Sequence, residues 1–82
     1  MSIFLQENLY TNNMKTNKFP QNLKLLRQQE KISQDKLANL VGVTQQCISE
    51  WENGKIEPTL SFLWKLADIF NISVDELIGR ID

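Results

Sequence analysis

Residues 33–54, SQDKLANLVGVTQQCISEWENG, contain two helix starts separated by one tight reversal. Ser33 and Thr44 are both residues that cap helix N-termini, and each precedes apolar residues at helical spacing. Gly42 lies between them, where a chain reversal requires a residue that adopts a left-handed conformation. Because two short helices joined so closely cannot move independently, this segment predicts a rigid helical pair.

The packing of this pair is indicated by Ala38 and Ile48. Ala38 lies where the first helix would cross the second, and only a small side chain permits a close approach there. Ile48 would lie on the inward face of the second helix. A small residue, a turn glycine and an aliphatic residue at these separations are typical of a helix-turn-helix, which we place at residues 34–53. Such a unit lays one helix across a DNA backbone and directs the next into the major groove.

Helical spacing continues on both sides of this pair. Pro20 suits the first turn of a preceding helix, whose one face carries Leu23, Leu26, Arg27 and Glu30. A fourth helix is predicted to begin at Pro58-Thr59, with a buried face made of Leu60, Leu63, Leu66, Ala67 and Phe70. Ser73 and Glu76 predict a capping box for a short fifth helix that bears Leu77 and Ile78.

No strand-like alternation appears after residue 18, so we predict an all-α, five-helix bundle over residues 19–82. Residues 1–18 are rich in Asn and Thr without a sustained helical period, and we expect a flexible extension with a short ordered piece around residues 3–9. Since the chain ends at Asp82, we expect no separate sensory or oligomerisation domain.

Composition argues against catalysis and against a membrane protein. There is no histidine, and Cys47 is the only cysteine, so the commonest general base and an internal disulfide are both excluded. We therefore expect no enzyme, no metal, no cofactor and no small-molecule ligand. The N-terminus lacks the pattern of a signal peptide, and no apolar run approaches about 20 residues, which favours a cytoplasmic protein.

With these motifs in place, the chain resembles the Cro/C1-type helix-turn-helix family, also called the Xre family. The segment LKLLRQQEKISQDKLANLVGVTQQCISEWENGKIEPTLSFLWKLADIF follows the family's order of helices, and the resemblance covers roughly residues 19–77. TQQCISEWENGK is similar to the recognition helix of a lambdoid phage repressor. The resemblance implies a lambda-repressor-like domain that binds double-stranded DNA.

The resemblance also implies roles for individual residues. Gln45 and Gln46 match the pair that reads bases, and a glutamine can bond adenine through N6 and N7. Taken alone, two glutamines on a helix would be ordinary solvated surface residues. Phosphate contacts are expected mainly from Gln34, Asn53 and Lys55. The full set of candidate DNA-binding residues is Gln34, Lys36, Thr44, Gln45, Gln46, Ser49, Glu50, Asn53 and Lys55.

Other residues receive supporting roles. Arg27 and Glu52 match a partly buried ion pair that would fix the angle of the recognition helix. Trp51 and Trp64 are expected to be core or dimer-contact aromatics rather than platforms for stacking bases. Cys47 is expected to be a small side chain near the DNA backbone, because a redox sensor needs a stabilised thiolate and Glu50 opposes one.

The sequence departs from the family in its charge. Glu50 stands where the phage repressor has a neutral glutamine, and residues 56–58 lack the basic side chains that relatives place against phosphates. The net charge of −1 and the pI of ≈ 5.3 fit few phosphate contacts, with Lys24, Lys36 and Lys55 along one face. We therefore expect weak nonspecific binding and a shallow dependence of affinity on salt.

These observations predict a transcriptional regulator, most simply a repressor that occludes a promoter. Because one short helix reads few base pairs, we expect a homodimer on a pseudo-palindromic operator, with recognition helices about 34 Å apart. The dimer contact would come from Ile78 and Ile81, from Trp64, or from the N-terminal extension, and the C-terminal helices are favoured. The alternative is a protein-interaction module or antitoxin-like subunit that keeps the fold without reading DNA.

Overall fold

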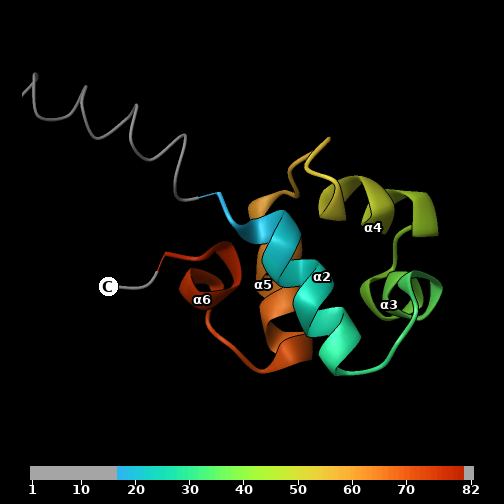
Figure 1. The fold of residues 1–82 in the computed structure, drawn as a ribbon, viewed down its shortest axis with the longest axis horizontal. Helices are drawn as coiled ribbons and strands as arrows, with labels where there is room; N and C mark the ends of the chain where they lie inside the picture. The colour runs from blue at the N-terminus through green and yellow to red at the C-terminus, as the bar shows by residue number, and fades with distance from the viewer. Residues whose placement is uncertain (1–16, 81–82) are drawn as a thin grey trace, which may run out of the picture.

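The computed structural model describes residues 17–80, which form five helices and, within that range, no strand (Figure 1). The helices are α2 (Phe19–Gln29), α3 (Gln34–Val41), α4 (Gln45–Glu52), α5 (Leu60–Phe70) and α6 (Val74–Ile78). The predicted all-α bundle is therefore confirmed. The proposed order around residues 3–9 and the proposed role of Ile81 concern positions outside the described residues.

The helices are arranged around α2 and α5, which cross the centre of the domain (Figure 1). α3 and α4 lie on one side of this centre, and α6 lies on the other. At the α6 side the backbone N–H of Lys18 donates to the carbonyl oxygen of Ile78 at 3.3 Å, so the start of α2 is held against the end of α6. No helix within residues 17–80 is long and apolar enough to cross a bilayer.

Side-chain caps define where four of the helices begin. Ser33, Thr44, Thr59 and Ser73 each accept a hydrogen bond from the backbone N–H three residues further on. The Glu76 carboxylate also accepts from the backbone N–H of Ser73 at 3.0 Å, which completes the predicted capping box. These caps satisfy backbone N–H groups that the first turn of a helix leaves without partners. The helix starts that the sequence predicts at these residues are therefore confirmed.

The core gathers apolar side chains from all five helices of the described region. Its buried members are Phe19, Leu23, Leu37, Ala38, Val41, Ile48, Trp51, Leu66, Ala67 and Leu77. The prediction for α5 was wrong at Leu60, which is 56% exposed. Leu60 is the first residue of α5, and helical spacing alone cannot show that the first turn of a helix extends past the core.

The two tryptophans lie in different environments. Trp51 is buried, with its ring edge-on to Phe19 at a centroid distance of 6.4 Å and tilted against Phe62 at 5.5 Å. Trp51 therefore fixes α4 to α2 and α5, as expected for a core aromatic. Trp64 on α5 is 58% exposed, so it is not part of the core.

Gly42 has the left-handed conformation that the reversal required, with φ of 89°. Its N–H donates to the carbonyl oxygen of Ala38 at 2.8 Å, and that of Val43 donates to the same oxygen at 3.0 Å. A Cβ at this position would meet only the Lys65 ammonium nitrogen, at 3.7 Å. A side chain would therefore be opposed by the backbone conformation and not by crowding.

We expect Gly42→Ala to lower the free energy of unfolding by about 1–2 kcal/mol, because alanine is strained in the left-handed region. Gly42→Asn is the matched control and should lose less, since asparagine tolerates this region better. Urea denaturation of the three proteins measures the difference. Equal losses for alanine and asparagine would show that the conformation of the reversal is not the cause.

Candidate nucleic-acid interface

The α3–α4 unit presents one polar face of α4 to solvent. Gln45 and Gln46, in the first turn of α4, are exposed, and Ser49 and Glu50 are partly exposed one turn later. Ile48 and Trp51 lie on the buried side. The predicted division of this helix into a core-facing and an outward face is therefore present in the structure.

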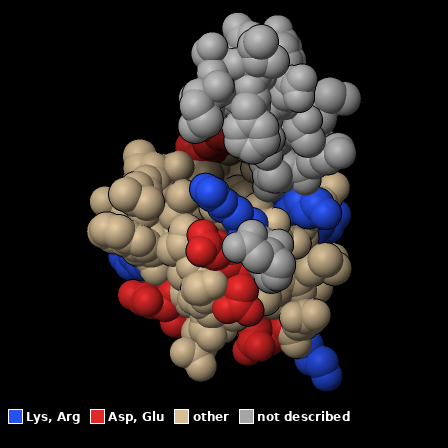
Figure 2. All heavy atoms as spheres, turned by 90° about the vertical axis from the view of Figure 1, so that its left-hand side faces the viewer, with Lys and Arg blue, Asp and Glu red and all other residues tan. Residues whose placement is uncertain are grey.

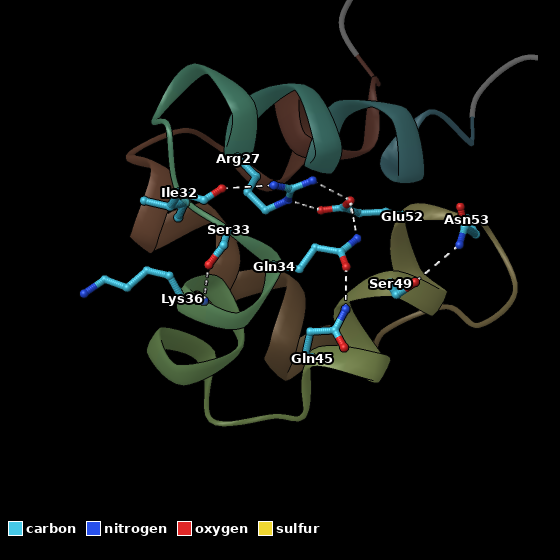
Figure 3. A network of polar contacts seen from close by, with 9 residues as sticks. All are labelled: Arg27, Ile32, Ser33, Gln34, Lys36, Gln45, Ser49, Glu52 and Asn53. Atoms are coloured by element: carbon cyan, nitrogen blue, oxygen red, sulfur yellow. Dashed lines mark hydrogen bonds and ion pairs between the residues drawn. The ribbon is translucent and has the colours of Figure 1, made fainter.

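The angle of α4 is held by an ion pair between Arg27 of α2 and Glu52 at the end of α4 (Figure 3). The Arg27 Nε donates to Glu52 Oε2 at 2.6 Å, and its Nη2 donates to Oε1 at 3.1 Å. The third guanidinium nitrogen donates to the carbonyl oxygen of Ile32 at 2.9 Å. The structure thus contains the pair that the resemblance implied, in the bidentate geometry that makes such pairs strong.

The burial of Glu52 makes its ion pair with Arg27 important for stability. Glu52 is only 8% exposed and is the one charged residue that is buried within residues 17–80. The hydrogen bond to Glu52 raises the pKa of Arg27 above its ordinary value, while burial of the guanidinium opposes that rise. A carboxylate removed from water in this way depends on its partners, because an unpaired buried charge is costly.

Two glutamines extend the ion pair to the protein surface (Figure 3). Gln34 Nε2 donates to Glu52 Oε1 at 3.0 Å, and Gln45 Nε2 donates to Gln34 Oε1 at 2.6 Å. The family resemblance implies only a phosphate contact for Gln34, whereas in the structure both ends of its amide form hydrogen bonds to other side chains. One amide hydrogen of Gln34 remains for a phosphate. The sequence offers no signal for these bonds, because each joins a side chain of α3 to a side chain of α4.

The other candidate residues surround this centre. The Thr44 hydroxyl oxygen caps α4 by accepting from the Cys47 N–H at 3.1 Å, which leaves its own O–H free to donate. Ser49 Oγ accepts from Asn53 Nδ2 at 3.4 Å. Lys36 and Asn53 lie at opposite ends of the group of side chains in Figure 3. Such flanking positions suit contacts to the DNA backbone on either side of a groove.

Two further features concern charge. Burial raises the pKa of the Cys47 thiol, and the neighbouring Glu50 carboxylate raises it further, so the reactive thiolate is disfavoured.

The face that carries α6 shows acidic side chains with basic ones among them (Figure 2), and Asp75 and Glu76 of α6 are exposed. This acidic charge lies on the side of the domain away from α3 and α4 (Figure 1).

The structure does not gather the candidate residues into a basic surface. Lys36 and Lys55 are both exposed, but Asp35 lies beside the first, and Glu50 lies among the predicted base-reading residues. The open depression at this surface, lined by Arg27, Ser33, Gln34, Asp35 and Gln45, combines both signs of charge. The candidate interface is thus predominantly amide and hydroxyl in character.

Known proteins share this fold. A sequence profile described as Helix-turn-helix matches residues 23–77. YonR of Bacillus subtilis, an uncharacterized HTH-type transcriptional regulator derived from the SPbeta prophage, is 38% identical over 60 residues, which are 73% of this chain and 56% of YonR. The chain spans about half the length of the first curated relatives that it matches.

Solved structures extend the comparison. The restriction-modification controller protein C.AhdI from Aeromonas hydrophila has a TM-score of 0.69 and 32% identity, covering 80% of this chain and 96% of that one. Hydroxypropylphosphonic acid epoxidase from S. wedmorenis has a TM-score of 0.70 and 34% identity, but the match covers 77% of this chain and only 34% of the enzyme. The profile, the relatives and the arrangement of α3 and α4 agree: the chain belongs to the Cro/C1-type (Xre) helix-turn-helix family of DNA-binding transcriptional regulators.

Proposed function

We propose that this protein binds a specific double-stranded DNA operator in the cytoplasm and represses transcription by occluding a promoter. The observation that carries the proposal is the division of α4, which buries Ile48 and Trp51 and leaves Gln45 and Gln46 at its outward N-terminal end. The N-terminal residues of a recognition helix are the ones that reach base edges in this mode of docking.

The proposed contacts fall into two classes. Gln45, Gln46, Ser49 and Glu50 would meet base edges, and Glu50 could accept from cytosine N4. Phosphates would be contacted by Gln34, Lys36, Thr44, Asn53 and Lys55. Because only two of these nine side chains are cationic, we expect specificity to depend on base contacts more than on general attraction to the DNA backbone.

We expect Gln45→Ala and Gln46→Ala each to weaken binding to the selected operator about 5- to 100-fold, since one bidentate base contact is worth about 1–3 kcal/mol. Binding to scrambled duplex DNA should change little. The matched control is Gln29→Ala, an exposed glutamine on the α2 surface that faces Ile72 and Glu76. Operators selected from a random duplex pool and titrated by fluorescence anisotropy supply the measurement. Unchanged operator affinity in both variants would reject base reading.

We further propose a homodimer on a pseudo-palindromic operator. Among the residues suggested by the sequence, Ile78 is half-buried in the protomer's own core, Ile81 lies outside the described residues, and Trp64 is exposed. Leu60, one turn before Trp64 on α5, is exposed as well. These two exposed apolar side chains on α5 support a dimer contact at this surface.

We expect Trp64→Glu to shift the protein from dimer to monomer, because a carboxylate at the centre of an apolar contact remains unpaired. Leu25→Glu is the matched control, as Leu25 is a comparably exposed apolar residue on α2. Sedimentation velocity over a range of concentrations distinguishes the two states. A wild-type protein that stays monomeric at high concentration contradicts the dimer.

A second candidate is a protein-interaction module that keeps the fold without reading DNA. Glu50 on the outward face of α4 and the exposed aromatic ring of Trp64 favour it. The epoxidase match shows that a chain of this fold can be part of an enzyme, but the present sequence has no histidine, and we propose a non-catalytic role. Loss of operator binding in the Gln45 and Gln46 variants separates the DNA-binding function from this candidate.

A further inference from the structure

We propose that Lys31, in the turn between α2 and α3, is a further phosphate-contacting residue whose charge is retained at a cost in stability. The inference rests on the proposed DNA binding and adds one residue to the nine candidates named above. It starts from the backbone conformation of the turn.

Lys31 is an exception among the left-handed residues of the domain. Within residues 17–80, a positive φ occurs at Gly42, Gly54, Gly79 and Asn71, and at Lys31 with φ of 58°. Glycine has no Cβ to clash in this region, and asparagine adopts it more often than most other residues, whereas a lysine is strained. The lysine therefore lowers the stability of the fold relative to a glycine at the same position.

The left-handed conformation is required by the way α2 ends. The N–H of Lys31 donates to the carbonyl oxygen of Gln28 at 3.0 Å, and that of Ile32 donates to the carbonyl oxygen of Arg27 at 3.2 Å. These bonds close the last turn of α2 and need a left-handed residue directly after the helix, where glycine is most common. Both α3 and α6 end with glycine in this role. The geometry of the turn thus gives no reason for a lysine after α2.

Lys31 lies at the edge of the candidate interface. The carbonyl oxygen of the next residue, Ile32, accepts from the Arg27 guanidinium at 2.9 Å, and Ser33 then lines the open depression of this surface. Figure 3 shows the backbone passing from α2 through Ile32 and Ser33 into α3, where Gln34 is the next proposed phosphate contact. Because the Lys31 side chain is exposed and flexible, its ammonium group can reach a phosphate beside Gln34.

The surface around the start of α3 has no surplus of positive charge. Arg27 is bound to Glu52, and Asp35 lies beside Lys36. A phosphate held here would be repelled by Asp35. Within residues 17–80 the one ion pair is that of Arg27 with Glu52, so the Lys31 ammonium has no carboxylate held against it. An additional cation at this edge would offset Asp35, which accounts for a strained lysine at the turn.

Lys31→Gly tests the proposal because its two expected effects have opposite signs. Removing the strained Cβ should raise the melting temperature by about 2–6 °C. Removing the charge should lower the affinity for operator and scrambled duplexes by one common factor, about 3- to 10-fold at ~0.1 M salt. The slope of log K against log salt concentration should become shallower by about 0.9. Thermal denaturation and fluorescence anisotropy titrations of the full chain at several salt concentrations supply the measurements.

Two matched variants control for strain and for net charge. Lys31→Arg keeps both the charge and the strain, so it should retain the wild-type affinity, salt slope and melting temperature. Arg80→Gln removes one positive charge just after α6, on the side of the domain away from α3 and α4 (Figure 1). It should leave the salt slope unchanged, since exposed charges are screened beyond about 10 Å.

A Lys31→Gly protein that is more stable but binds duplex DNA with wild-type affinity and salt slope would overturn the proposal. An equal loss of affinity in Arg80→Gln would also overturn it, because the effect would then come from net charge alone. If Lys31→Gly is no more stable than wild type, the lysine has no cost at this turn and the proposed trade between stability and binding is wrong. If the wild-type protein binds no duplex DNA in these titrations, the proposed function itself has failed.

Discussion

Arg27→Met is expected to lower the free energy of unfolding by about 3–5 kcal/mol, because it leaves the Glu52 carboxylate buried without its countercharge. Gln34 would remain as a single neutral hydrogen-bond donor to that carboxylate. A loss of this size is a large share of the stability of a small domain, which is about 5–15 kcal/mol. Urea denaturation followed by circular dichroism measures it.

The double variant Arg27→Met with Glu52→Met is the control for this result. Replacing both members of a buried pair by apolar side chains of similar volume is commonly neutral or stabilising. We therefore expect the double variant to recover most of the stability that the single variant loses. If the double variant is as unstable as Arg27→Met, then the loss comes from packing around α2 and not from an unpaired charge.

Leu37→Ala is expected to cost about 2–5 kcal/mol, since it removes a fully buried side chain and leaves a cavity between α3 and the rest of the core. Leu37 has 0% exposure, whereas Leu40, three residues later on the same helix, is 46% exposed. Leu40→Ala is thus a matched control with the same chemical change on the outward side, and its expected cost is below about 0.5 kcal/mol.

Urea or thermal denaturation of both leucine variants decides between burial and helix propensity as the source of the effect. Alanine is the better helix former, so propensity alone would stabilise both variants slightly. Similar losses at the two positions would contradict the assignment of Leu37 to the core and of Leu40 to the surface.

Local chemistry accounts for most of what could be predicted. Helix caps and turn glycines act within a few residues of their own position, so the sequence alone predicts them. This holds for the caps at Ser33, Thr44 and Ser73 and for the left-handed Gly42. Helical spacing likewise assigned Ile48 to the core. It was wrong for Leu60, because whether the first turn of a helix is covered depends on where its neighbours end.

The candidate site was predicted less completely. Its residues were identified through the family resemblance, and the Arg27–Glu52 pair came with them. The bonds from Gln34 to Glu52 and from Gln45 to Gln34 join residues 18 and 11 positions apart in sequence. Such bonds depend on the crossing of α3 and α4, which residue types and their spacing do not determine.

The contrasting surroundings of the two tryptophans give this chain a pair of intrinsic optical reporters. Trp51 is held between Phe19 and Phe62, so its emission should redden when α4 detaches from the domain. Trp64 already faces water, and its emission should respond instead to whatever covers the α5 surface. Variants that retain a single indole would allow each event to be followed separately, without an attached dye.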